Sequence, residues 1–246
     1  MKASSKLLLT ALLFFIATVV AYNAVLTKEY KKGTYKDPYQ NYSSLDHTGF
    51  TAIDVRGANY MRVKIIPGEY KVWVHKSAKD FIKVKQEQDR LLVGMAFDEE
   101  VRNVSAPYYV IISTPDLKHL QTDASYTVNG KELYMDTVGD GKFNGVTVYV
   151  QDLSMDSLNL VQSRASKVML SNNKLGALKA TVGEQDGSQS ILELSGSNQV
   201  QQANLDIKNR SELHLENVRI PKLTYTFSDN TKVTVSGASL ASVLKN

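Results

Sequence analysis

The pentapeptide SKVML, residues 166–170, recurs as SILEL at 190–194, SELHL at 211–215 and TKVTV at 231–235. Each version begins with a hydroxyl residue and then places apolar residues at alternate positions, which is typical of a β-strand with one buried face. The starts of successive versions lie 24, 21 and 20 residues apart. A shorter alternating piece precedes each version, such as Leu158 and Leu160 before the first. The C-terminal half of the chain is therefore a repeat of short strands.

This repeat predicts the fold class. Because a single turn of about 20 residues cannot bury its own apolar side chains, successive turns must stack on one another. We predict an all-β protein, a parallel β-helix or β-solenoid preceded by one N-terminal transmembrane helix. A β-sandwich with coincidental strand spacing is the alternative. Leu240, Val243 and Leu244 fall at helical spacing and predict a short terminal segment that lies over the final turn of the repeat.

The preceding half of the chain also has a β pattern. From Phe50 to Ser113, short segments rich in Val, Ile, Thr and Tyr alternate with Gly, Asn, Asp and Ser. Pro67-Gly68 and Asn129-Gly130 mark tight turns. No segment in this region has a sustained helical period.

The charge of the chain is concentrated at its N-terminus. Six of the 29 basic residues and two of the 25 acidic residues precede Ser44, which leaves 23 of each in the remainder. A neutral domain lacks the excess of positive charge that supplies most nucleic-acid affinity, so we expect no nucleic-acid partner. The chain contains no cysteine, which excludes disulfides, thiolate nucleophiles and cysteine metal sites.

The N-terminal segment can cross a membrane. Residues 7–27 are uncharged and mostly apolar, and a helix of this length matches a bilayer core of about 30 Å. The alternative is a cleaved secretory signal, with Lys2 and Lys6 as its charged leader and Ala21 near the cleavage site. We favour retention because the apolar run continues past that site. The predicted domains are a transmembrane helix or signal anchor at 1–27, a juxtamembrane linker at 28–44 and the β-solenoid domain at 45–246.

The region after the linker resembles a known family. The matching positions are Phe50-x-x-Ile53-x-Val55-x-Gly57, Val63 and Ile65 before Pro67-Gly68, Val72 and Val74, Leu91 and Val93, and Tyr109-Val110-x-Ile112 followed by Pro115-x-Leu117-x-x-Leu120. This pattern is similar to the opening of the head GIN domain family of putative auto-transporter adhesins, which are bacterial envelope proteins. With the later repeat, the resemblance covers about residues 45–237. One departure is Asp123-Ala124-Ser125-Tyr126, where similar domains have a Ser-Gly-rich turn.

The resemblance implies an extracytoplasmic β-helical domain, with adhesion as the family's label. It implies a bacterial cell membrane location, with a single membrane pass and the C-terminal domain in the periplasm or at the cell surface. Lysines flank residues 7–27 on both sides, so charge alone does not set this orientation. The resemblance supplies no functional residues.

No catalytic or metal motif is present in the sequence. The four histidines, His47, His75, His119 and His214, are far apart and form no metal-binding motif. No serine occupies a Gly-x-Ser-x-Gly elbow. We therefore predict a protein that is not an enzyme and has no cofactor or metal. The alternative is a polysaccharide lyase that uses calcium, for which the candidate residues are Asp136, Asp140, Asp152 and Asp156 with Lys142 or Arg164.

Two groups of residues are candidates for a binding surface. Tyr126, Tyr134 and Tyr149 could stack on sugar rings, although tyrosine is also common as a packing residue in strands. Lys167, Glu193, His214 and Lys232 alternate with the apolar residues of the pentapeptides and are expected to point outward.

The function predicted from the sequence is a non-catalytic binding, adhesion or envelope-scaffold module. Its predicted partners are the membrane, through residues 7–27, and a glycan or an envelope protein. The ectodomain of a signalling system is a further alternative.

Overall fold

The computed structural model describes residues 3–98, 109–136 and 146–244 and divides the chain into two compact units, Met1–Tyr42 and Ser43–Asn246. The first unit contains helix α1 (Ala3–Lys32) and the short 3-10 helix η1 (Thr34–Lys36). Helix α1 ends where Gly33 adopts a positive φ of 69°, a conformation that favours glycine after a helix. It is long and apolar enough to cross a membrane, a test that a signal sequence also passes.

Within the described residues, the second unit consists of two sheets and three short helical segments. The nine-stranded sheet contains, in spatial order, β1 (Tyr42–Leu45), β4 (Lys71–His75), β7 (Val110–Thr114), β3 (Val63–Pro67), β11 (Val148–Gln151), β13 (Lys167–Ser171), β15 (Ile191–Ser195), β17 (Glu212–Glu216) and β19 (Lys232–Ser236). The ten-stranded sheet contains β10 (Lys131–Tyr134), β9 (Ser125–Val128), β6 (Arg90–Phe97), β2 (Ala52–Arg56), β8 (His119–Asp123), β12 (Ser154–Gln162), β14 (Lys174–Val182), β16 (Gln199–Ile207) and β18 (Lys222–Phe227), with β5 (Ile82–Glu87) paired to β6. The helical segments are η2 (Lys76–Ala78), η3 (Gly237–Ser239) and α2 (Leu240–Val243).

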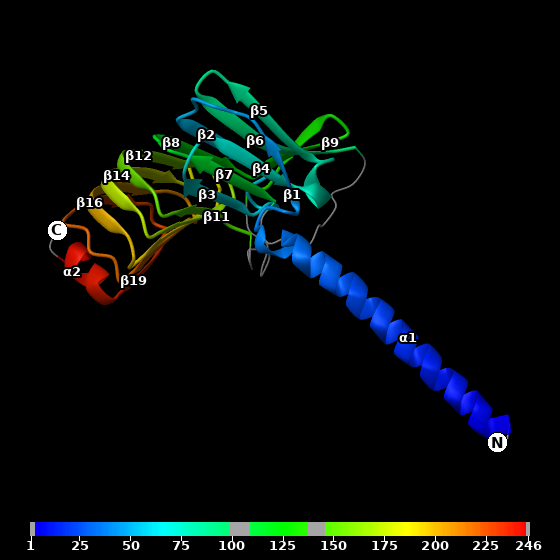
Figure 1. Ribbon diagram of the computed structural model, residues 1–246. Helices are drawn as coiled ribbons and strands as arrows, with labels where there is room; N and C mark the ends of the chain where they lie inside the picture. The colour runs from blue at the N-terminus through cyan, green and yellow to red at the C-terminus, as the bar shows by residue number, and fades with distance from the viewer. Residues whose placement is uncertain (1–2, 99–108, 137–145, 245–246) are drawn as a thin grey trace. The chain divides into compact units, whose positions relative to one another are not determined.

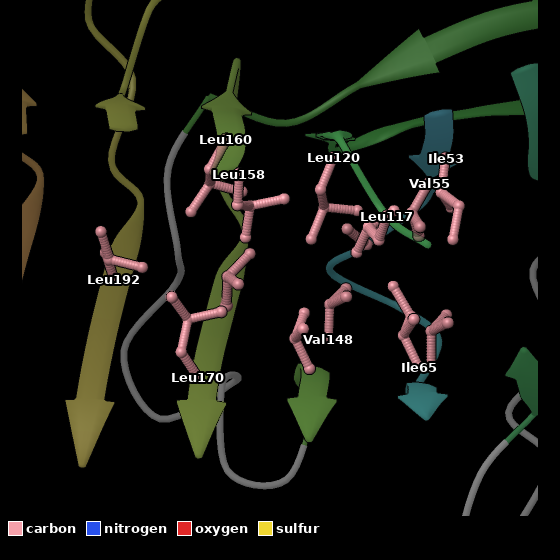
Figure 2. Close-up of a cluster of buried hydrophobic side chains, with 14 of the residues drawn as sticks. Ile53, Val55, Ile65, Leu117, Leu120, Val148, Leu158, Leu160, Leu170 and Leu192 are labelled. Atoms are coloured by element: carbon pink, nitrogen blue, oxygen red, sulfur yellow. The ribbon is translucent and has the colours of Figure 1, made fainter. Parts of the chain in front are cut away.

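The two sheets enclose one hydrophobic core (Figure 1). Figure 2 shows Leu158, Leu160 and Leu120 of the ten-stranded sheet pointing toward Leu170 and Val148 of the nine-stranded sheet. These side chains are at most 1% exposed. Alternation along each strand explains the arrangement, because every second side chain faces the opposite sheet.

The repeated pentapeptides lie side by side in one sheet. Val168 is opposite Leu192, Leu192 is opposite Leu213, and Leu213 is opposite Val233, all in parallel pairs. The first three side chains are buried, whereas Val233, on the edge strand β19, is 36% exposed. The predicted alignment of the repeat is confirmed at these positions.

The predicted fold class, a parallel β-helix or β-solenoid, is nevertheless wrong. The chain forms two large mixed sheets, not a closed parallel coil, because the described strands include antiparallel pairs: β4 with β7, β5 with β6, and β9 with β10. Two of these pairs follow from tight turns. Asn129 and Gly130 join β9 to β10 and Gln88 lies between β5 and β6, all with positive φ. Such short connections can join only antiparallel neighbours.

Candidate functional site

The strands β12, β14 and β16 share a kink on the outer face of the ten-stranded sheet. Each has two consecutive outward residues between buried ones: Asp156-Ser157, Gly176-Ala177 and Gln201-Gln202. The first residue of each pair is skipped in the pairing of adjacent strands. The skipped position is the same on both partners, so the register is unchanged on either side, whereas a β-bulge would give one strand an extra residue. Pro221 precedes β18 at the position equivalent to Gln201 of β16. A proline is tolerated there because the skipped residue does not need its N–H for strand pairing.

A groove of about 620 Å³ follows these kinks across the sheet. Its lining residues come from the end of the loop before β8 and from β8, β12, β14, β16 and β18, and they are Lys118, His119, Ser157, Leu158, Asn159, Ala177, Leu178, Lys179, Gln202, Ala203, Asn204, Lys222 and Thr224. We call it the lysine–amide groove. His119, Asn159, Lys179, Asn204 and Thr224 form one continuous row across five strands. Such a row repeats polar groups about every 4.8 Å, the spacing between neighbouring strands.

The groove is polar and basic. The side chains of Leu158, Leu178 and Ala203 are buried beneath it, and the small outward side chain of Ala177 leaves its middle open. Among the described residues that line the groove there is no carboxylate. It therefore offers amide and ammonium groups to a ligand, and the lysines favour negative charge.

The lysines differ in their surroundings. Lys118 Nζ lies 3.3 Å from Asp116 Oδ2 in an exposed ion pair. Within the described part of the chain, Lys179 and Lys222 have no ion-pair partner, and both side chains are exposed. Asn159 Nδ2 lies 3.4 Å from His119 Nδ1, a long contact that leaves both groups available to other partners. Lys179 and Lys222 are thus the groove's uncompensated charges.

Four of the predicted binding residues lie together on the outer face of the other sheet. Lys167 Nζ is 2.8 Å from Glu193 Oε2, His214 Nε2 is 3.3 Å from Glu212 Oε2, and Lys232 Nζ is 3.2 Å from the same glutamate's Oε1. Glu193 is only 8% exposed. These side chains on β13, β15, β17 and β19 form ion pairs with one another. They are therefore less available to bind a charged ligand than the unpaired lysines of the groove.

The three predicted tyrosines do not form one surface. Tyr149 lies on β11 in the nine-stranded sheet, in the same outward row as Glu193 and His214. Tyr126 and Tyr134 lie on neighbouring strands of the ten-stranded sheet, but Tyr126 is opposite Leu133 and Tyr134 is opposite Ser125. This register places the two rings on opposite faces of the β9–β10 hairpin.

The surroundings of the tyrosines also differ. Tyr126 packs edge-on against Tyr60, with ring centroids 4.8 Å apart. Burial, followed by a hydrogen bond with Tyr126, raises the pKa of Tyr60 to about 12. Tyr134 is 59% exposed, and the Arg164 guanidinium carbon lies 4.4 Å from its ring centroid. Tyr126 is thus a packing residue, whereas the exposed ring of Tyr134 contacts the Arg164 guanidinium.

Among the described residues of the lyase alternative, Asp136 lies beside Arg164, whereas Asp152 and Asp156 lie toward the other end of β12. Arg164 pairs with Asp136 at 3.3 Å and with Asp123 at 3.0 Å, beyond the C-terminal end of β12. Asp152 hydrogen-bonds with Asn172 before the other end of that strand. Asp156 lies at the kink of β12, while Asp140 and Lys142 lie outside the described residues. No group of three or more His, Asp or Glu side chains within the described residues could hold a metal ion.

The residues of the groove were missed by the sequence analysis, although a signal for them was present. Asn159 lies between Leu158 and Leu160, and Lys179 and Asn204 occupy the equivalent positions on β14 and β16. The outward residues of the shorter repeat pieces therefore marked this row. The kink itself could not be predicted from the sequence, because two consecutive polar residues also occur where a strand ends.

The comparisons with known proteins give remote similarities. No protein-family model matches the sequence, and no curated protein matches it. Similar solved structures include a protein from Bacteroides fragilis described as a putative adhesin, with 12% identity, a TM-score of 0.42 and coverage of 79% of this chain and 96% of that chain. A putative adhesin from Parabacteroides distasonis has 11% identity, a TM-score of 0.45 and coverage of 78% and 79%. A putative lipid binding protein from the same species has 10% identity, a TM-score of 0.28 and coverage of 80% and 94%.

Similarity at this level does not indicate a shared ligand or activity. The first two structures are described as putative adhesins, and the predicted resemblance to the head GIN domain family is matched by no family model.

Proposed function

We propose that the chain is a membrane-anchored, extracytoplasmic binding module that holds an anionic glycan in the lysine–amide groove and does not chemically alter it. In this proposal residues 1–27 anchor the chain in the bacterial cell membrane, residues 28–44 are a linker, and residues 45–246 are the binding domain. The observation that carries the proposal is the groove itself, which combines Lys179 and Lys222 with a row of amides and, among the residues that the structure describes, has no lining carboxylate.

The chemistry of the groove favours an acidic polysaccharide over a neutral one. Asn159, Gln202 and Asn204 can both donate to and accept from sugar hydroxyls, as amides do. Lys179 on β14 and Lys222 on β18 lie about 10 Å apart across the strands and about 7 Å apart along them, so an extended polymer that crosses the strands obliquely can place acid groups near both. The outward methyl group of Ala177 can pack against the apolar side of a sugar ring. An overall neutral domain favours this local recognition over the broad basic surface that nucleic acid requires.

A direct test measures binding of the full chain in detergent to polygalacturonic acid and to neutral galactan. We expect binding to the acidic polymer that weakens as salt rises, because exposed charges are screened. Lys179→Ala should reduce the affinity about fivefold, which corresponds to about 1 kcal/mol. Lys174→Ala is the matched control, since Lys174 is also exposed on β14 but does not line the groove.

Two results would contradict the proposal. Equal affinities for the acidic and neutral polymers would remove the role of the lysines, and equal losses in Lys179→Ala and Lys174→Ala would place the ligand elsewhere. Duplex DNA that binds as strongly as the acidic polymer would argue for a nucleic-acid partner. The absence of catalysis is tested separately: release of unsaturated sugars from polygalacturonic acid, with or without calcium, would show a lyase.

A further inference from the structure

A second cavity of about 590 Å³ lies on the outer face of the same sheet. Its walls come from β5, β6, β2, β8 and the β9–β10 hairpin. Gln121 of β8 lines this cavity, and His119 of the same strand lines the lysine–amide groove. The two residues are two positions apart on one strand and face the same side, so the cavity and the groove adjoin at β8.

Asp54 lines this cavity with an unsatisfied oxygen. The residue is 5% exposed, and its neighbours across the sheet are Leu92 and Gln121. Arg56 Nε lies 3.4 Å from Asp54 Oδ2, whereas Oδ1 has no hydrogen-bond donor among the described residues. Burial raises the pKa of Asp54 against the opposing effect of Arg56. A buried carboxylate that lacks a donor on one oxygen is unfavourable, so a ligand that donates a hydrogen bond to Asp54 from the cavity stabilises the carboxylate.

The charges around Asp54 restrict the ligand. Arg56 and Arg90 both act on its carboxylate, so a ligand cation would meet two guanidinium groups. Lys85 is paired with Glu87 at 2.8 Å, and Lys83 donates to the carbonyl of Asp80 at 2.8 Å. Within the described residues, Arg90 has no ion-pair partner. A neutral hydroxyl is therefore the donor that suits Asp54, and a carboxylate is the group that suits Arg90.

We propose that this cavity is a subsite for a single sugar acid, in which a hydroxyl group donates to the Asp54 carboxylate and the ligand's carboxylate binds Arg90. The inference rests on the proposed function for its ligand class. In this arrangement the terminal unit of the acidic polymer occupies the cavity, and the remaining units lie in the lysine–amide groove on the other side of β8.

The test uses the full chain in detergent with galacturonic acid, and with galactose as the sugar that lacks the carboxylate. We expect galacturonic acid to bind and galactose to bind at least tenfold more weakly. Asp54→Asn and Arg90→Gln should each weaken binding of galacturonic acid about tenfold. Asp206→Asn is the control, because Asp206 stands in the same outward row of the sheet as Asp54 and lies outside the cavity.

The outcomes separate the two proposals. If Asp54→Asn and Asp206→Asn bind galacturonic acid equally, or galactose binds as well as galacturonic acid, the subsite is refuted whatever the groove does. If Asp54→Asn weakens galacturonic acid while Lys179→Ala leaves polygalacturonic acid binding unchanged, the subsite stands and the groove proposal fails. Asp54→Asn removes an unfavourable buried charge, so a loss of binding does not reflect unfolding.

Discussion

Buried side-chain amides join neighbouring strands at the turns of the repeat. Asn173 is fully buried, donates to the carbonyl of Val150 at 2.9 Å and to Asn198 Oδ1 at 3.0 Å, and accepts from the N–H of Leu153 at 3.1 Å. Asn198 continues the ladder by donating to the carbonyl of Leu170 at 2.6 Å. These two residues satisfy backbone groups that the turns leave without strand partners, and a buried backbone group without a partner is destabilising.

Asn173→Ala should therefore be strongly destabilising. The substitution removes three hydrogen bonds and leaves buried groups unsatisfied, so we expect a loss of about 3 kcal/mol in the free energy of unfolding. Urea denaturation of the full chain in detergent measures it. Asn204→Ala, at an exposed position in the groove, should change stability by less than about 0.5 kcal/mol. Equal effects of the two substitutions would refute the structural role of the ladder.

The stability of the domain should also depend on pH through Asp54. Burial raises the pKa of this carboxyl in the folded state, so the folded protein retains the proton to a higher pH than the unfolded chain. The associated stability is complete below the unfolded pKa of about 3.9 and is lost as the pH rises through the folded pKa. Asp54→Asn cannot ionise and should be more stable than the unsubstituted protein at neutral pH.

This advantage of Asp54→Asn should disappear as the pH falls below about 4. Urea denaturation across a pH series checks the trend. An Asp54→Asn protein that is less stable than the unsubstituted protein at neutral pH would contradict the unfavourable effect assigned to the buried charge.

At the scale of single elements, the end of the stacked strands is held by hydroxyl groups. The sequence pattern predicted that Leu240, Val243 and Leu244 would cover the last strands. Leu240 and Leu244 are instead 48% and 80% exposed, and of the three only Val243 packs against the core. The contacts come from serines of η3 and α2, which the apolar pattern could not reveal. Ser239 Oγ accepts from the N–H of Val218 at 2.8 Å, and Ser242 Oγ accepts from the N–H of Ile220 at 2.9 Å.

Ser239→Ala should leave the N–H of Val218 buried without a partner. We expect a loss of about 1–2 kcal/mol in the free energy of unfolding. Ser236→Ala is the control, since Ser236 is exposed at the end of β19. Thermal unfolding of both variants compares them, and a Ser239→Ala protein as stable as the control would show that the hydroxyl is dispensable.

At the scale of the whole molecule, the local alternation of apolar residues predicted where the strands lie in the sequence better than it predicted how the strands are ordered in the sheets. The alternation from Val168 to Val235 located the strands and their parallel register, because stacked repeats pair like with like. The sheets as a whole depend on pairings distant in sequence, such as β11 beside β3 and β8 between β2 and β12. No local propensity encodes those contacts, and this is why a closed coil was predicted where two mixed sheets exist. The lysine–amide groove escaped prediction for a different reason, because the kinks shared by β12, β14 and β16 have no signal in the sequence.

The membrane anchor is a separate prediction for the whole chain. No described residue of α1 is buried, and its apolar side chains are exposed. If residues 7–27 cross a bilayer, Ile16→Arg places a charge near the centre of the span and should cost about 3 kcal/mol of insertion free energy. The variant should move from the membrane fraction toward the soluble fraction after alkaline extraction.

Tyr30→Arg, near the end of α1, should remain in the membrane, because long basic side chains reach the interface. The mass of the protein isolated from cells distinguishes a retained anchor from a cleaved signal. A chain that lacks its first residues and is fully soluble would refute the anchor.

The kinks shared by β12, β14 and β16 have a consequence for how such a protein changes over evolutionary time. Because neighbouring strands each contribute one bend and one outward polar residue, duplication of a single strand pair would lengthen the lysine–amide groove by about 4.8 Å. Ligand length could thus be adjusted by unequal recombination, without redesign of any contact already in place.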